Sequence, residues 1–213
     1  MKKIAMLIVF DMDGIFIEER SSWKIIHKKF GIDNSDLVQK YIDGEIKDKE
    51  FLDGDIKRWR ERGIKREDIV RVFNEIPLTE GTEKCLQFFK ERMHTAIISG
   101  GIDLLANRIA SFGIEHVFAN GIEFKGDVPW RGILRVPIRK KDIILKDLIK
   151  KLDLERKDVV VVGDTRYDLG MFEIAGISIA FNAKEDIIKH ADFVVKKRDL
   201  REIIKIWKNN FEA

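Results

Sequence analysis

The sequence predicts an α/β fold: a doubly wound, mostly parallel, Rossmann-like sheet with a small helical cap domain inserted after the first strand and a β-hairpin flap. Short apolar runs rich in Val, Ile and Ala alternate with amphipathic stretches of helix length, which is typical of a parallel sheet covered on both faces. One long stretch after the first run carries only helical patterning. The chain of 213 residues has room for one domain with such an insertion.

The predicted sheet strands are residues 4–10, 94–98, 159–162, 177–181 and, more weakly, 192–195. Amphipathic helices are predicted at residues 81–92, 102–112, 140–152 and 200–211. Because strand and helix alternate, right-handed crossovers should place helices on both faces. The first run follows Lys2 and Lys3 but is short for a signal sequence and has no small-residue cleavage site after it. A buried strand is therefore the better interpretation.

The region from about residue 21 to about residue 76 is the predicted helical insertion. An apolar stripe marks its first helix and consists of Trp23, Ile26, His27 and Phe30. Ser21 or Ser22 is the expected N-cap, and further helices are predicted at residues 36–42, 48–62 and 66–75. We therefore expect a core domain of residues 1–18 and 77–213 and a cap domain of residues 19–76. Residues 120–135 should form the hairpin around the turn Lys125-Gly126-Asp127.

The amino-acid composition limits the kinds of molecule that the protein is expected to bind. The chain has 40 basic and 37 acidic residues, a net charge of +3 that is too balanced to indicate nucleic-acid or membrane-surface binding. No apolar stretch approaches the ~20 residues of a membrane span. Cys85 is the single cysteine, which excludes an internal disulfide and a cysteine zinc cage. We expect a cytoplasmic protein whose partner is a small molecule; the oligomeric state stays open.

Acidic side chains follow the predicted strands at their carboxyl ends, where open α/β sheets bind ligands. The candidate ligands of this edge are Asp11, Asp13, Asp164 and Asp168. Two carboxylates ~4 Å apart repel by on the order of 4 kcal/mol at an effective dielectric constant of ~20, so converging aspartates need a cation. An all-oxygen ligand set favours Mg²⁺, which also takes phosphate oxygens.

A phosphate-binding set lies at the same edge. Ser99 with Gly100 stands at the start of a predicted helix and offers a hydroxyl and unhindered N–H groups to an anion, and Lys141 offers a point charge. A metal, a lysine and a helix N-terminus around one group suit phosphoryl transfer. One carboxylate can act as the nucleophile. A second carboxylate, which lies two residues further along the chain, can act first as a general acid and then as a general base.

These residues, in this order, resemble the haloacid-dehalogenase-like hydrolase superfamily over nearly the whole chain. The resemblance implies that Asp11 is the nucleophile and a metal ligand, and that Asp13 is the general acid/base and reaches the metal through its backbone carbonyl. It implies that Ser99 and Lys141 hold phosphate. It also implies that Asp164 binds Mg²⁺, with Asp168 binding the metal directly or supporting a ligand.

Within that superfamily the chain resembles the phosphoserine phosphatase branch, through the helical insertion and residues 77–81, 98–101, 118–120, 126–128, 179–184 and 197–203. Three substrate-reading positions differ: Arg20 replaces a Glu that binds the substrate ammonium, Asp53 replaces an Arg that binds its carboxylate, and Tyr167 replaces an Asn. Other residues could take over by a small shift of register, namely Glu18, Glu19, Arg58 or Arg60. The implied function is a Mg²⁺-dependent phosphatase that hydrolyses a small phosphomonoester through an aspartyl-phosphate, with altered substrate-reading residues.

Several alternatives stay open. The substrate could be another small metabolite of the sugar, nucleotide or phosphoglycolate type, or the chain could bind a phospholigand without catalysis. A phospho-receiver signalling domain also gathers acids, a hydroxyl and a lysine, but it would be shorter and would need neither a cap nor Asp13. Four histidines lack ligand spacing and are interpreted as packing or surface residues: His27, His94, His116 and His190.

Overall fold

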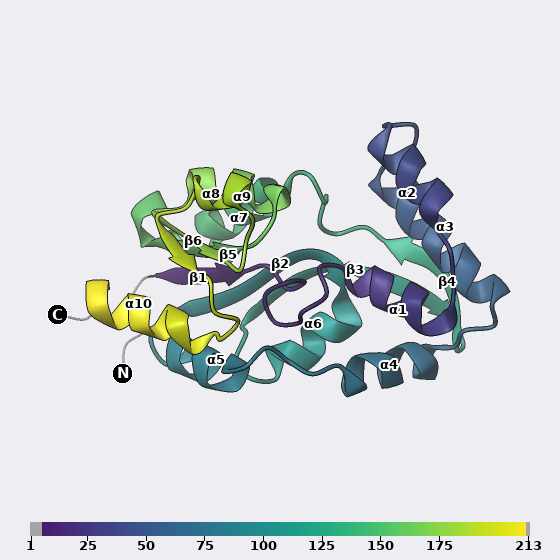
Figure 1. Cartoon of the computed structure of the whole chain (residues 1–213), viewed down its shortest axis with the longest axis horizontal. Coiled ribbons are helices and arrows are strands. Elements are labelled where there is room, and N and C mark those ends of the chain that lie inside the picture. Colours follow the sequence, from purple (N-terminus) through teal and green to yellow (C-terminus); the bar gives the residue numbers. More distant parts are fainter. Residues whose placement is uncertain (1–5, 212–213) are drawn as a thin grey trace.

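The protein, described here from a computed structural model, is built on one seven-stranded sheet (Figure 1), and the description covers residues 6–211. The strand order is β4-β3-β2-β1-β5-β6-β7. The strands are β1 Leu7–Phe10, β2 His94–Ile102, β3 His116–Lys125, β4 Val128–Ile133, β5 Val159–Gly163, β6 Ile177–Phe181 and β7 Phe193–Val195. Every pairing is parallel except that of β3 with β4. The predicted doubly wound, mostly parallel α/β class is confirmed.

Helices cover both faces of the sheet (Figure 1). On one face lie α5 Thr82–Lys90, α6 Asp103–Ala110 and α10 Arg201–Phe211; on the other lie α7 Lys141–Lys151, α8 Leu169–Ile174 and α9 Glu185–Ile188. The alternation of side chains along β1 explains how one strand serves both faces. Ile8 and Phe10 belong to the core beneath α5, α6 and α10, whereas Leu7 and Val9 belong to the core beneath α7 and α8.

The segment between β1 and α5 is helical, as predicted. It contains α1 Ser22–Phe30, α2 Ser35–Ile42, α3 Asp48–Glu61 and α4 Arg66–Glu75. These helices lie on the side of the molecule that holds β4, against which α3 packs (Figure 1). Ser21 is the N-cap of α1, because its side chain accepts a hydrogen bond of 3.3 Å from Lys24 N. The division into cap and core domains stays a prediction.

Strand boundaries differ from the prediction most clearly at β2 and β3. β2 continues to Ile102, so residues 99–101 lie within an irregular strand and not after it; the register shifts between Ser99 and Ile102. β3 begins at His116, because Ala96 pairs with it in parallel before the chain turns into the hairpin. The hairpin at residues 120–135 therefore consists of the outer half of β3 and β4. Of the predicted first strand, residues 4–5 and the preceding Lys2 and Lys3 lie outside the described residues.

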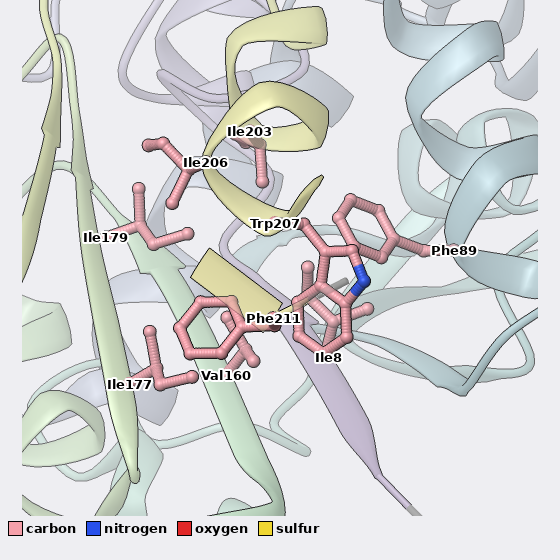
Figure 2. A pocket seen from close by; sticks show the side chains of 9 residues that line it. All are labelled: Ile8, Phe89, Val160, Ile177, Ile179, Ile203, Ile206, Trp207 and Phe211. Atoms are coloured by element: carbon pink, nitrogen blue, oxygen red, sulfur yellow. The ribbon is translucent and has the colours of Figure 1, made fainter. Parts of the chain in front are cut away.

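The carboxyl-terminal helix closes one face with apolar side chains. Trp207 and Phe211 of α10 lie over Ile8 and Val160 and enclose a gap of about 10 Å³, seen from close by in Figure 2. A gap of this size holds about one water molecule and its lining is apolar, so it is a packing defect and not a ligand site. Within residues 6–211, no helix has the length and apolarity needed to cross a bilayer.

Candidate active site

Three buried aspartates meet at the carboxyl edge of the sheet. Asp11 directly follows β1 and its backbone N–H donates to Val162 O at 2.9 Å, which ties it to β5. Asp164 follows β5, and Asp168 ends the short 3₁₀ turn Arg166–Asp168. One carboxylate oxygen from each lies within 4.8 Å of the others. The predicted convergence of these three residues is therefore present, as the adjacency of β1 and β5 requires.

Lys141 neutralises part of this charge. It begins α7, and its Nζ lies 2.9 Å from Asp11 Oδ2 and 2.8 Å from Asp168 Oδ1. Burial lowers the pKa of the ammonium, but the two carboxylates more than offset this, so the pKa of Lys141 lies above its usual value. The pKa of Asp11 is raised because burial outweighs the opposing effect of Lys141. The lysine is thus a permanent cation beside Asp11.

Asp168 has little bonding capacity left for a ligand. Its Oδ2 accepts hydrogen bonds from Asp164 N at 3.1 Å, Thr165 N at 3.0 Å and Thr165 Oγ1 at 3.2 Å, while its Oδ1 faces Lys141. These bonds fix the loop that carries Asp164 and the side chain of Lys141. The arrangement favours a positioning role for Asp168 over direct coordination of an ion.

Asp164 shows the opposite pattern. Its side chain is fully buried, and neither carboxylate oxygen has a hydrogen-bond partner among the described residues. Burial, together with the charges of Asp11 and Asp168, raises the pKa of Asp164 to about 8. Buried polar groups are normally satisfied, and a buried carboxylate that lacks hydrogen bonds and lies beside other carboxylates is what a divalent cation requires. The donor set therefore fits a hard metal ion, with Asp164 and Asp11 as the candidate protein ligands.

Asp13 is held at one oxygen only. Its Oδ2 accepts from Ser22 N at 2.8 Å and from Ser22 Oγ at 3.0 Å, at the start of α1, while Oδ1 is buried without a hydrogen-bond partner in residues 6–211. Burial and the charge of Asp11 raise the pKa of Asp13 to about 7, against the opposing effect of the Ser22 bonds. A carboxyl group that titrates near neutral pH can both donate and accept a proton there.

The predicted phosphate-binding residues also lie at this edge. Ser99 is buried next to Asp11, and a hydrogen bond between their side chains lowers the pKa of Asp11. Gly100 presents its carbonyl to Trp23 Nε1 at 3.1 Å and to Asn120 Nδ2 at 3.1 Å, which ties this bend to α1 and to β3. A Cβ on Gly101 would lie 2.7 Å from Asp13 Oδ2, so the absent side chain lets β2 approach the Asp13 loop.

Gly14 fixes the close approach of the first loop to Asp164. Its φ is +82°, and a Cβ there would lie 2.3 Å from Asp164 Oδ2. Both the backbone conformation and the contact require glycine. This position was not among the predicted site residues, although a glycine after Asp-x-Asp was visible in the sequence.

The three substrate-reading positions have different surroundings. Arg20 points into the site, where its Nε lies 3.0 Å from Asp164 Oδ2. Asp53 accepts from Gly132 N at 2.8 Å and pairs with Lys49, so it fastens β4 to α3. The Tyr167 hydroxyl accepts from Arg166 Nη2 at 3.2 Å. Of these three residues, Arg20 alone pairs with the side chain of a predicted metal ligand within residues 6–211.

The residues considered as substitutes are engaged in other contacts. Arg58 pairs with Asp36 at 2.7 Å, and Arg60 donates to Trp130 O at 2.8 Å. Glu19 pairs with Lys28, whereas Glu18 lines an open cleft beside Arg20. Arg58 and Arg60 are therefore engaged in helix and hairpin packing.

Two histidines lie close together at the amino ends of β2 and β3, away from the carboxyl ends that carry the aspartates. Ligand atoms of His94, Glu115 and His116 lie within 4.8 Å of one another, and His94 Nδ1 is 2.8 Å from Glu115 Oε2. Sequence spacing gave no sign of this group, because only the pairing of β2 with β3 brings residues 94 and 116 onto neighbouring strands. The interpretation of His94 and His116 as packing or surface residues stays a prediction, while His27 is buried against Trp59 as expected.

Comparison with known proteins agrees with this geometry. Residues 5–176 match the haloacid dehalogenase-like hydrolase family. A phosphoserine phosphatase of Methanocaldococcus jannaschii is 30% identical over 98% of this chain and 100% of its own. One of Archaeoglobus fulgidus is 31% identical over 95% of this chain, which spans 60% of that protein. A solved structure of a phospho-aspartyl intermediate analogue of phosphoserine phosphatase is 28% identical, with a TM-score of 0.76 over 97% of this chain and 99% of its own.

The chain therefore belongs to the haloacid dehalogenase-like hydrolase family. Within it, the relatives described above place the chain in the branch that is like phosphoserine phosphatase.

Proposed function

We propose that this protein is a Mg²⁺-dependent phosphatase that hydrolyses a small phosphomonoester through an aspartyl-phosphate formed on Asp11. The observation that carries the proposal is the convergence of Asp11, Lys141 and the unsatisfied Asp164 in one buried site. The match to a hydrolase family, and the similarity to proteins named phosphoserine phosphatase, support a phosphoric monoester hydrolase.

The first half-reaction uses Asp11 and Asp13 together. A carboxylate oxygen of Asp11 attacks phosphorus while the bond from phosphorus to the ester oxygen breaks. Asp13 gives its proton to the departing alcohol oxygen. With its pKa raised to about 7, Asp13 carries that proton in about half of the molecules at neutral pH.

The second half-reaction regenerates the site. Asp13, now ionised, takes a proton from a water molecule as the water oxygen attacks the same phosphorus. The bond from phosphorus to Asp11 breaks, which releases phosphate and restores Asp11. The balance of the two steps is one ester and one water in, one alcohol and one phosphate out.

The remaining residues bind and orient the phosphoryl group. Lys141, the Ser99 hydroxyl and the backbone at Gly100 would hold the oxygens that gain charge in the transition state; Lys141 is paired with Asp11, and Ser99 is buried beside it, which supports this assignment. Asp164 and Asp11 would hold Mg²⁺, with Asp13 contributing its carbonyl; the ion would neutralise the developing charge. Asp168 keeps Lys141 and the Asp164 loop in place.

We propose that residues 19–76 act as a cap domain that closes over this site. Asp48 Oδ2 at the start of α3 accepts from Ile138 N at 3.0 Å, and Tyr41 O accepts from Arg139 Nη2 at 3.2 Å. Both contacts are made to the segment that leads into Lys141. Asp11, Asp13, Ser99 and Lys141 are all buried, and closure of the cap would exclude bulk water from them during reaction.

The substrate is proposed to be a small phosphorylated metabolite, and the altered substrate-reading residues weigh against phosphoserine. Arg20, a cation inside the site, would repel the ammonium group of phosphoserine, and Asp53 is committed to Gly132 and Lys49. Sugar, nucleotide and phosphoglycolate esters remain candidate substrate types. A phospholigand-binding protein without turnover is the alternative that the experiment must separate.

The test is hydrolysis of a chromogenic aryl phosphate by wild-type protein and by Asp11→Asn, with Mg²⁺ and with chelator. We expect turnover only for wild type with Mg²⁺. Binding of phosphate without turnover in wild type would favour the non-catalytic alternative. Near-normal turnover by Asp11→Asn would remove Asp11 as the nucleophile.

A further inference from the structure

Arg20 connects the buried carboxylates to the surface. Its Nε lies 3.0 Å from Asp164 Oδ2, and its Nη2 donates to Asn182 O at 3.0 Å. The Arg20 side chain is 39% exposed, whereas that of Asp164 is 0% exposed. Arg20 also lines an open cleft of about 750 Å³ together with Glu18, Lys24 and Arg198. It is thus a cation at the boundary between the cleft and the acidic cluster.

The ion pair neutralises Asp164 without using its bonding capacity. Although the guanidinium is within ion-pair distance, both Asp164 oxygens remain without a hydrogen bond among residues 6–211. An arginine built as a permanent structural partner normally meets a carboxylate through aligned N–H groups, often two at once. The charge of Arg20 therefore compensates that of Asp164, while the lone pairs of the Asp164 carboxylate stay available to another ligand.

We propose that Arg20 is the resident counter-ion of Asp164, which it neutralises until a divalent cation takes that carboxylate and displaces the guanidinium into the cleft. The inference rests on the metal role assigned to Asp164 under the proposed function. It adds that Arg20 competes with the metal ion, so that the affinity of the site for Mg²⁺ is set partly by a residue that never coordinates it.

The surroundings of Arg20 allow this exchange. The guanidinium is partly solvated, so it loses little on leaving Asp164, and the cleft offers the carboxylate of Glu18, an exposed residue, as an alternative partner. Glu19, by contrast, is held by Lys28. A positive charge that stayed 3.0 Å from Asp164 would oppose the incoming cation, since like charges at that range repel strongly in a partly buried site.

The experiment is a calorimetric titration of the metal-free full chain with Mg²⁺ at fixed ionic strength and at a pH above about 8, where Asp164 is ionised. Arg20→Gln removes the charge and should tighten Mg²⁺ binding by about tenfold, whereas Arg20→Lys should keep the affinity within about threefold of wild type. Lys24→Gln is the matched control, because it removes a cation from the same cleft without a contact to Asp164, and should change the affinity by less than about twofold.

A melting experiment gives a second readout that does not depend on activity. In chelator, Arg20→Gln should melt below wild type because Asp164 loses its counter-ion, and Mg²⁺ should raise its melting temperature by more than it raises that of wild type. If Arg20→Gln binds Mg²⁺ no more tightly than wild type does, the counter-ion inference is overturned while the proposed function stands. If neither protein binds Mg²⁺, both are overturned.

Discussion

Asp13 carries the proton chemistry of the proposed reaction, and the leaving group decides how much that proton matters. An aryl phosphate departs as a stable phenolate, whereas an alkyl phosphate needs a proton on its oxygen. In Asp13→Asn we expect turnover of an alkyl phosphate to fall by ~10²–10⁴-fold. The first burst of phenolate from an aryl phosphate should survive, because that step needs little acid. Stopped-flow and steady-state assays measure the two effects.

The burst of phenolate from the aryl ester distinguishes a loss of acid catalysis from general damage to the site. If the burst disappears together with alkyl turnover, the substitution has disturbed Asp11 or the phosphate site and the acid assignment is unsupported. If alkyl turnover falls by less than about tenfold, Asp13 is not the proton donor.

Arg20 should select the charge of the leaving group. Three esters of similar size differ at one end: phosphoglycolate carries a carboxylate, ethyl phosphate is neutral, and phosphoethanolamine carries an ammonium. At saturating Mg²⁺ we expect kcat/KM to fall in that order by about tenfold or more overall, because the guanidinium in the cleft attracts an anion and repels a cation. Arg20→Gln should flatten the series. An unchanged order in Arg20→Gln would show that another group reads the leaving group.

The geometry of the site depends on Gly14, which lies in the loop that follows β1. Gly14 and Gly44 both have positive φ, at +82° and +77°, but only at Gly14 would a Cβ strike Asp164; at Gly44 nothing lies within 4 Å. Each substitution by Ala should cost ~1 kcal/mol of stability for the backbone strain. Gly14→Ala should in addition push Asp164 aside and weaken Mg²⁺ binding by tenfold or more. Melting curves and Mg²⁺ titration measure the two quantities.

Gly44→Ala is the control for this prediction, since it carries the strain without the collision. If both variants keep the wild-type affinity for Mg²⁺, Asp164 does not depend on the approach of Gly14. A loss of affinity in Gly44→Ala as well would point to a general effect of strain and not to the contact with Asp164.

Residues at the ends of parallel strands were predictable, because the register of the sheet brings those ends to one edge. The convergence of Asp11 and Asp164 follows from β1 lying beside β5. Contacts that depend on loop paths were not predictable. The side chain of Arg20 reaches Asp164 only because the loop after Gly14 folds back, and Ser22 meets Asp13 only because α1 begins there.

The ends of the strands show the same difference between features that the sequence predicts and features that depend on long-range contacts. Periodicity marked the buried strands, but β2 continues through a Ser-Gly-Gly bend that reads as a loop, since its later residues pair with β3 across a register shift. The first half of β3 mixes His, Asn and apolar residues and carries no clear alternation. The proximity of the His94 and His116 side chains also depends on this long-range register, in which His116 pairs with Ala96.

The stability of the whole molecule should depend on pH in a direction set by its buried acids. The pKa of Asp13 is raised to about 7 and that of Asp164 to about 8, against 3.8 in the unfolded chain. Between about pH 4 and pH 8 the folded state therefore binds more protons than the unfolded state. The free energy of unfolding must then fall as pH rises through this window in chelator. A loss of ~2 kcal/mol would lower the melting temperature by about 4–8 °C.

Mg²⁺ should reverse most of this loss, because it binds the ionised carboxylates of the folded state. Asp164→Asn removes one of the buried acids and should both flatten the pH dependence in chelator and abolish stabilisation by Mg²⁺. Chelated wild-type protein that is as stable at pH 8 as at pH 5 would contradict the burial of these acids as the cause.

The most direct test is to find the phosphoryl group itself. Wild-type protein is mixed with Mg²⁺ and a phosphomonoester, quenched in acid within milliseconds, digested and analysed by mass spectrometry. The account predicts an acid-stable, base-labile phosphoryl group on the peptide that contains Asp11, and none in Asp11→Asn. Turnover of the ester with the phosphoryl group on another residue, or with no phosphorylated peptide at any quench time, would contradict it.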